Sequence, residues 1–101
     1  MAKGYWVASL TITDQAKYDA YRAINGEAFH KYGGRFLVRG GAFETPAGGD
    51  PHPRQIVIEF PSYQAAKDCY HSPEYQRAIA ARSDGVEIDH VIVEGYDGPQ
   101  P

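Results

Sequence analysis

Lys31-Tyr-Gly-Gly-Arg-Phe-Leu-Val-Arg-Gly-Gly41 is the stretch of sequence that decides the fold. Gly33 can adopt the positive φ with which many helices end, so the first glycine pair indicates the end of a helix. The apolar run after Arg35 predicts a short strand, and the second glycine pair closes it. Because alternate residues of a strand point to the same face, Arg35 and Arg39 are expected to share a face with Leu37.

The sequence before this stretch predicts a strand and a helix. Residues 5–13 alternate, with Trp6 and Leu10 on an apolar face and Tyr5 on a mixed one. Thr13 or Asp14 is placed to cap the helix that follows, because a short oxygen side chain accepts from free backbone N–H groups.

The sequence after it predicts a second half of similar order. Residues 42–53 are rich in Pro and Gly and indicate a long exposed hairpin loop, and residues 55–60 form a third strand. Ser62 caps a helix that Ser72-Pro-Glu74 restarts, and residues 86–96 form the last strand.

The resulting order is βαββαβ, which predicts an α+β, ferredoxin-like fold with a four-stranded antiparallel sheet. Residues 1–96 are expected to form one domain, and residues 97–101 a flexible tail. The helices can cover only one face of the sheet, which leaves apolar side chains such as Val7 and Leu37 on the other. An uncovered apolar face indicates an interaction surface, so we expect a homodimer that packs sheet against sheet.

Composition excludes several classes of protein. The 101 residues carry a net charge of −3 with scattered basic residues, which argues against a nucleic-acid partner. No signal peptide or membrane span is recognisable, and the single cysteine, Cys69, requires no oxidising compartment. A cytoplasmic protein without a cofactor is therefore expected.

A set of short motifs, in order along the chain, is similar to an uncharacterised bacterial family, domain of unknown function 1330. The motifs are Gly4-Tyr-Trp6, the stretch 31–41, Arg54, Ile58-Glu-Phe-Pro-Ser62, Ser72-Pro-Glu-Tyr75, Arg82 and Val93-Glu-Gly95. The resemblance covers roughly residues 4–96 and implies a ferredoxin-like subunit of a dimeric α/β barrel. That superfamily includes cofactor-independent monooxygenases, haem-handling enzymes and isomerases, so the resemblance leaves the chemistry open.

Arg39 and Glu59 are the leading candidates for catalysis and ligand binding. Both are expected on neighbouring strands, on the face away from the helices. An arginine can hold a carboxylate through two hydrogen bonds, and a glutamate in a dry cavity can act as a base. The alternative is an interface salt bridge that fixes the register of the dimer.

Further candidates surround this pair. Arg54 and Arg82 can add positive charge, although Arg82 also fits as a cation at a helix C-terminus. Tyr75 and Tyr18 are candidate ligand-binding hydroxyls, and at helical spacing both also fit the core.

Histidine and cysteine chemistry has less support from the sequence. The four histidines lack metal-site spacing, so no metal site is expected. Asp89 and His90 are neighbours in a strand and point to opposite faces, so they cannot form a catalytic pair. Cys69 lies in an amphipathic helix and fits a packed thiol better than a nucleophile.

Two functions of different class remain. One is a cofactor-independent enzyme or a ligand-binding protein that holds a small anionic or aromatic metabolite between sheet and helices. The other is a non-catalytic dimeric structural or interaction module. A pocket with a charged residue that lacks a protein partner would favour the first, and Arg39 paired across a two-fold axis would favour the second.

Overall fold

The computed structural model describes residues 2–101 and has the ferredoxin-like fold. Its elements are β1 (Gly4–Ile12), α1 (Gln15–Tyr32), β2 (Arg35–Arg39), β3 (Arg54–Phe60), α2 (Tyr63–His71), α3 (Pro73–Arg82) and β4 (Val86–Glu94). The four strands form one antiparallel sheet in the order β2-β3-β1-β4. The predicted order βαββαβ is confirmed, with the second helix divided into α2 and α3.

The expected caps explain where the helices begin and end. Asp14 accepts a hydrogen bond from the backbone N–H of Lys17, and α1 ends at Gly33, whose φ is 74°. Ser62 caps α2, and Ser72 both ends α2 and caps α3 by accepting from the N–H of Tyr75. Polar side chains of the right kind therefore satisfy the free backbone groups at each helix start.

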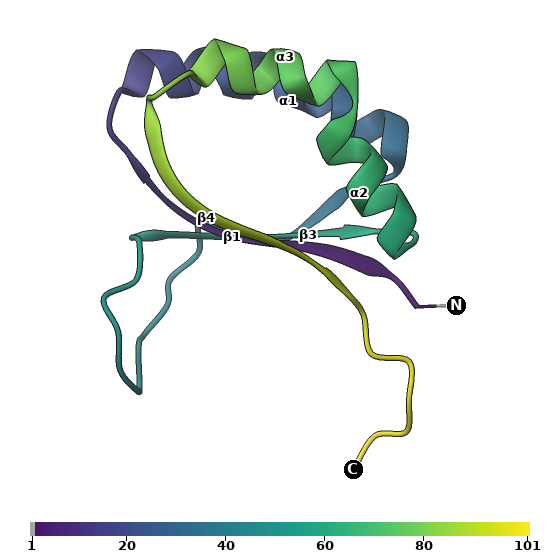
Figure 1. The fold of residues 1–101 in the computed structure, drawn as a ribbon. Helices are drawn as coiled ribbons and strands as arrows, with labels where there is room; N and C mark the ends of the chain where they lie inside the picture. The colour runs from purple at the N-terminus through teal and green to yellow at the C-terminus, as the bar shows by residue number, and fades with distance from the viewer. Residues whose placement is uncertain (1) are drawn as a thin grey trace.

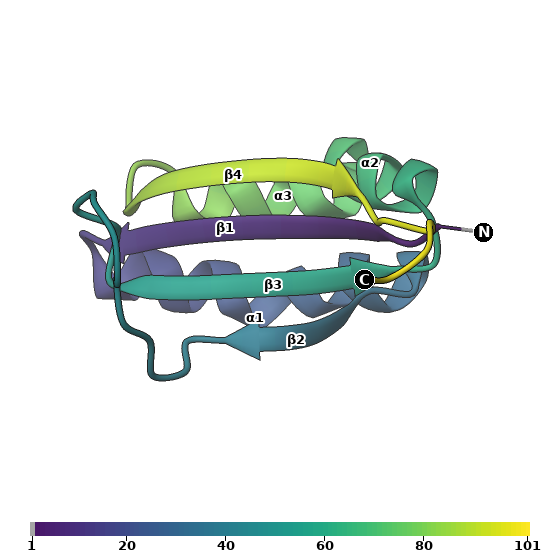
Figure 2. The same ribbon diagram turned by 90° about the horizontal axis from the view of Figure 1, so that it is seen from below.

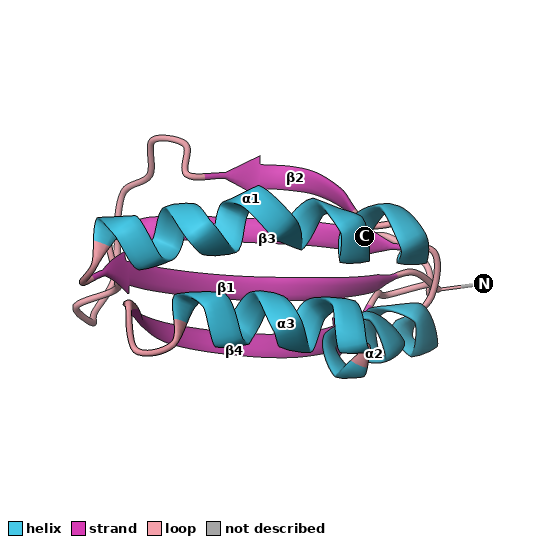
Figure 3. Ribbon diagram, turned by 90° about the horizontal axis from the view of Figure 1, so that it is seen from above, coloured by secondary structure: helices cyan, strands magenta, loops and turns pink. Residues whose placement is uncertain are grey.

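The three helices lie on one face of the sheet and leave the other face uncovered (Figure 1). α1 and α3 run along the strands (Figure 3), and the view from the opposite side shows bare strands (Figure 2). The segment between β2 and β3 and the C-terminal residues both extend on the uncovered side (Figure 1). No helix within residues 2–101 has the length and apolar content to cross a bilayer.

Trp6 is the centre of the core between sheet and helices. Its ring packs edge-on against Phe29 and Tyr75, with centroids 5.4 and 4.8 Å away. Its indole Nε1 donates a hydrogen bond of 2.8 Å to the carbonyl of Ala66 on α2. The buried indole is thereby satisfied while it joins β1 to all three helices.

The uncovered face carries exposed apolar side chains. Val7 on β1, Leu37 on β2, and Val91 and Val93 on β4 are all more than two-fifths exposed, and Val91 reaches 59%. The prediction of an uncovered apolar face is confirmed, whereas the dimer expected from it stays a prediction.

A β-bulge in β2 changes the face on which Arg39 lies. Phe36 pairs with Ile58 and Val38 with Val57, so Leu37 is the extra residue. After the bulge Arg39 is opposite Ile56, which faces the helices. The prediction that Arg39 shares a face with Arg35 and Leu37 is therefore wrong, because a bulge shifts strict alternation by one residue.

Candidate functional site

A cavity lies between α1 and the helix-facing side of the sheet. The space between its lining residues measures about 500 Å³, a value that includes solvent at its open side. The lining residues are Tyr18, Tyr21, Arg22, Asn25 and Phe29 of α1, Tyr75 of α3, and Trp6, Ala8, Leu10, Phe36, Arg39, Arg54, Ile56, Ile58, Ile88 and His90 of the sheet. Apolar and aromatic walls with a few polar groups are typical of a small-molecule site.

Three arginines line this cavity, and none of its lining residues is an acid. The guanidinium of Arg39 stacks over Phe36, with Cζ 4.2 Å from the ring centroid. Arg54 begins β3, and its Nε is buried without a hydrogen-bond partner among residues 2–101. Arg22 is exposed on α1. The cavity therefore presents an excess of positive charge, with one donor left unpaired.

Gly40 explains how the arginine group packs. Its φ is 72°, which glycine adopts without strain. A Cβ at this position would collide with the guanidinium of Arg54. The second glycine pair of the decisive stretch thus ends β2 and also leaves room for Arg54 beside the chain.

Two phenols close the cavity on the helix side. The hydroxyls of Tyr21 and Tyr75 are 2.7 Å apart and buried, and Asn25 also hydrogen-bonds Tyr21. Burial raises the pKa of both phenols, and for Tyr75 the nearby Tyr21 adds to the shift. Both hydroxyls therefore stay protonated near neutral pH and can donate hydrogen bonds.

Arg82 lies behind the phenols rather than in the lining. It is only 8% exposed, and its guanidinium lies over the Tyr21 ring at 5.2 Å. No carboxylate among residues 2–101 pairs with it. Arg82 stands in the last turn of α3, where its charge interacts favourably with the helix dipole, as expected. The same charge adds to the positive field near the cavity.

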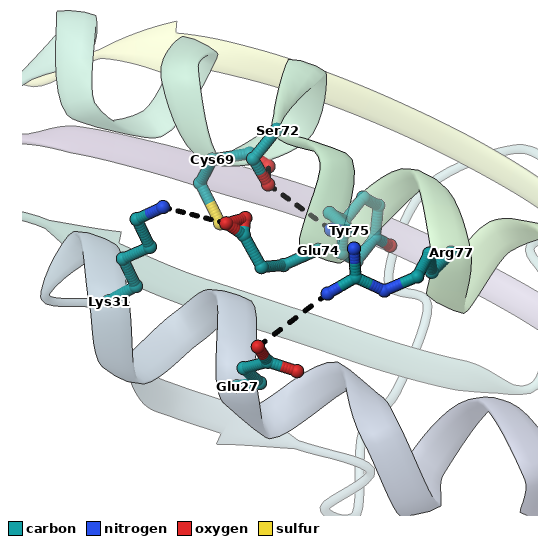
Figure 4. A network of polar contacts seen from close by, with 7 residues as sticks. All are labelled: Glu27, Lys31, Cys69, Ser72, Glu74, Tyr75 and Arg77. Carbon is teal, nitrogen blue, oxygen red and sulfur yellow. Dashed lines mark hydrogen bonds and ion pairs between the residues drawn. The ribbon is translucent and has the colours of Figure 1, made fainter.

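An ionic clamp holds the start of α3, which carries Tyr75, against α1 (Figure 4). Lys31 Nζ lies 2.7 Å from Glu74 Oε1, and Arg77 pairs with Glu27 at 3.6 Å. The hydrogen bond from Lys31 is the main reason that the pKa of Glu74 is lowered. With Ser72 capping the N–H of Tyr75, this clamp fixes where the Tyr75 side chain enters the cavity.

Glu59 lies on the other face of the sheet. Arg35 Nε donates to its carboxylate over 2.9 Å, and the Tyr5 hydroxyl donates over 3.4 Å. β2 and β3 are neighbours, as predicted, but the expected pairing of Arg39 with Glu59 is wrong. The register puts Arg35 opposite Glu59, and the bulge turns Arg39 to the other face. Of the predicted ligand-binding residues, the cavity brings together Arg39, Arg54, Tyr18 and Tyr75.

His90 lines the cavity from β4, opposite the side that carries Arg39 and Arg54. Its ring packs against Trp6 and Tyr70 at 4.9 and 5.4 Å, and its Nε2 is buried without a partner among residues 2–101. Burial, with the charge of Arg82, lowers the pKa of His90 to about 4. The imidazole is thus neutral at physiological pH.

The other histidine and cysteine candidates lie elsewhere. His52 contacts Thr11 at 2.7 Å and Asp89 at 3.3 Å, which ties the loop after β2 to the sheet. Cys69 is fully buried, and burial raises its pKa to about 12, as suits a packed thiol. Residues 2–101 hold no cluster of three His, Cys, Asp or Glu suited to a metal ion.

Sequence reasoning missed Arg22, Asn25 and His90. A signal for the first two existed: Tyr18, Arg22 and Asn25 recur at helical spacing, so two polar residues stand on the inward stripe of α1. His90 alternates with Ile88 on the inward face of β4, and an inward histidine on an apolar face is a comparable signal.

Comparisons with solved structures agree with this fold. A protein of unknown function from Rhodopseudomonas palustris superposes with a TM-score of 0.76 at 18% identity, covering 96% of this chain and 85% of that one. SnoaB, a cofactor-independent oxygenase from Streptomyces nogalater, superposes with a TM-score of 0.60 at 13% identity, covering 100% and 97%. At these identities the likeness concerns the fold alone.

Sequence comparison is more specific about the family. No curated protein matches the chain. One family profile matches residues 3–96, nearly the whole chain, and it spans the glycine pairs, the cavity arginines and the Ser-Pro-Glu-Tyr segment. The chain therefore belongs to the family described as domain of unknown function 1330 (DUF1330).

Proposed function

We propose that the protein binds a small carboxylate with an apolar or aromatic body in the cavity between sheet and helices. The observation that carries this proposal is the charge of the lining: three arginines and no acid, with Arg54 Nε buried and unpaired. A buried donor without a partner is costly, and a ligand oxygen would satisfy it. Arginine also matches a carboxylate geometrically through parallel hydrogen bonds.

The walls support an apolar body for this ligand. Phe36, Ile56 and Leu10 stand beside the arginines, and Trp6 and Phe29 follow deeper in the cavity. Burying a flat apolar group against such walls supplies most of the affinity, while the arginines orient its charged end. The criterion that favours ligand binding over a purely structural module is thus met: a cavity contains a charged residue without a protein partner.

Catalysis without a cofactor in this cavity is also part of the proposal. SnoaB, a cofactor-independent oxygenase, shares the fold. Here the protonated Tyr21–Tyr75 pair and the neutral His90 imidazole are groups that can donate or accept a proton at a bound molecule.

We also propose that the protein is a homodimer through its uncovered sheet face. Val7, Leu37, Val91 and Val93 are exposed there, and isolated domains rarely leave such a continuous apolar surface to water. A second copy is the occupant we favour, because identical flat sheet faces can be self-complementary about a two-fold axis.

Thermal unfolding with matched ligands tests the binding proposal. Benzoate and phenylacetate should raise the melting temperature in proportion to the logarithm of their concentration, and neutral benzamide should not. Arg54→Gln should weaken benzoate binding by about 10- to 100-fold, because a hydrogen bond to a charged group contributes about 1.5–3 kcal/mol. Arg35→Gln, at an exposed arginine on the other face of the sheet and outside the cavity, is the control. Equal shifts with benzoate and benzamide, or an unchanged Arg54→Gln protein, would contradict the proposal.

A further inference from the structure

A row of inward-facing residues crosses the floor of the cavity. Arg39 pairs with Ile56, Ile56 with Ala8, and Ala8 with His90, so these four side chains stand side by side across all four strands. Ala8 has the smallest side chain of the row, and in β1 it lies between the large Trp6 and Leu10. The hollow over Ala8 therefore lies between an arginine side and a histidine side.

Each side of this hollow carries one buried nitrogen without a partner. On one side it is Nε of Arg54, and Arg54 is opposite Leu10, two residues along β1 from Ala8. On the other side it is Nε2 of His90. Native structures leave few buried polar atoms unpaired, and two such atoms in one cavity call for an explanation.

The surroundings of His90 suggest how its imidazole is used. Trp6 and Tyr70 meet the ring at steep interplanar angles of 62° and 66°. A neutral imidazole carries one N–H and one lone pair, so Nε2 is a hydrogen-bond acceptor when the proton is on Nδ1. In that tautomer the unpaired Nε2 can accept a hydrogen bond from a ligand. The positive charge of Arg82 from α3 disfavours a second proton on the ring.

We propose that the ligand is an aromatic carboxylate bearing a hydroxyl group remote from the carboxylate, held by Arg54 at one end and by His90 at the other. This inference rests on the proposed function and deepens it. The two residues lie two strands apart and two residues apart in register, so their Cα atoms are separated by roughly 12 Å. Because both side chains rise from the same floor, that span suits one ring with a substituent at each end. The ring lies over Ala8, its carboxylate accepts from Arg54, and its hydroxyl donates to His90.

Calorimetric titration with matched benzoates tests this assignment. The probes are 3- and 4-hydroxybenzoate against 3- and 4-methylbenzoate, which keep the ring and the carboxylate and differ in the hydroxyl. Wild-type protein should bind at least one hydroxy acid about tenfold more tightly than its methyl counterpart, as expected for one additional hydrogen bond. In His90→Phe the affinities for the hydroxy acid and the methyl acid should differ by no more than about threefold, while methylbenzoate binding persists. His90→Gln is a second variant with a smaller side chain.

Two further variants separate the possible outcomes. Arg54→Gln should weaken hydroxy and methyl acids equally, and His30→Phe, at an exposed position of α1, should change neither. Arg54-dependent benzoate binding without a hydroxyl preference, or a preference that survives both His90 substitutions, would overturn the assignment of His90 and leave the proposed function standing. Failure of all benzoates to bind wild-type protein would overturn both.

Discussion

Lowering the pH should unfold this protein partly through His90. The folded protein holds the pKa of His90 at about 4 because the ring is buried and near Arg82, whereas the ordinary value is 6.5. As the pH falls below 6.5 the unfolded chain takes up a proton on this residue and the folded protein does not. The contribution of the neutral imidazole to stability is therefore complete above pH 6.5 and is lost as the pH falls toward 4.

The size of the effect follows from the two pKa values. The difference between the two pKa values, roughly 2.5, corresponds to a free energy of unfolding of about 3 kcal/mol at 1.36 kcal/mol per pKa unit. This full loss of stability is reached only below pH 4. At pH 5 the proton linkage predicts a loss of about 2 kcal/mol relative to pH 8. That loss is a large part of the stability of an ordinary small domain.

Urea unfolding at pH 8 and pH 5, followed by the fluorescence of Trp6, measures this contribution. Carboxylates such as Glu74 also titrate on the acid side, so the quantity to compare is the difference between wild type and His90→Phe at each pH. We expect wild type to lose about 2 kcal/mol more than the variant between the two pH values. Protein concentration must be held constant, because a dimer would make the midpoint depend on it. Parallel losses in the two proteins would refute the reasoning that His90 is buried and neutral in the folded state.

Three substitutions test other parts of the structure. Gly40→Ala should cost about 1 kcal/mol in urea unfolding because of its positive φ, and should weaken benzoate binding by calorimetry because the added Cβ displaces Arg54. An unchanged benzoate affinity would show that Arg54 does not need this space. Ala8→Leu should fill the hollow, abolishing the benzoate-dependent rise in melting temperature while the circular dichroism spectrum stays native. A persisting rise would place the ligand elsewhere. Val91→Glu should shift the mass measured by light scattering from dimer to monomer, whereas Ala80→Glu on the helix side should not. A wild-type protein that is already monomeric would refute the dimer.

The sequence was a good guide to the elements and their order. Helix caps and strand alternation are local signals, so Asp14, Gly33 and Ser72 could be assigned without knowing what they contact. Arg54 and Tyr75 were also assigned to the ligand site, and both line the cavity.

The pairing of side chains across the sheet could not be predicted from the sequence. A bulge depends on how two strands pair. No residue within Arg35–Arg39 indicates by its type that Leu37 is the extra residue. The missed bulge put Arg39 on the wrong face and so gave Glu59 the wrong partner, since Glu59 pairs with Arg35 instead. His90 was set aside as half of an unworkable pair with Asp89, because its real neighbours come from β1, α2 and α3.

The bulge at Leu37 also makes the charge of the cavity depend on one residue of an edge strand. Removing Leu37 would leave Val38 opposite Val57 and Arg39 opposite Ile56, so strict alternation would return with Arg39 still on the helix side. Keeping Leu37 but pairing it with Val57, without a bulge, would instead turn Arg39 to the uncovered face. The other strand pairs would stay in place, since β2 is an edge strand paired only with β3. Relatives that differ by one residue in this strand should therefore be compared first by the face on which this arginine lies.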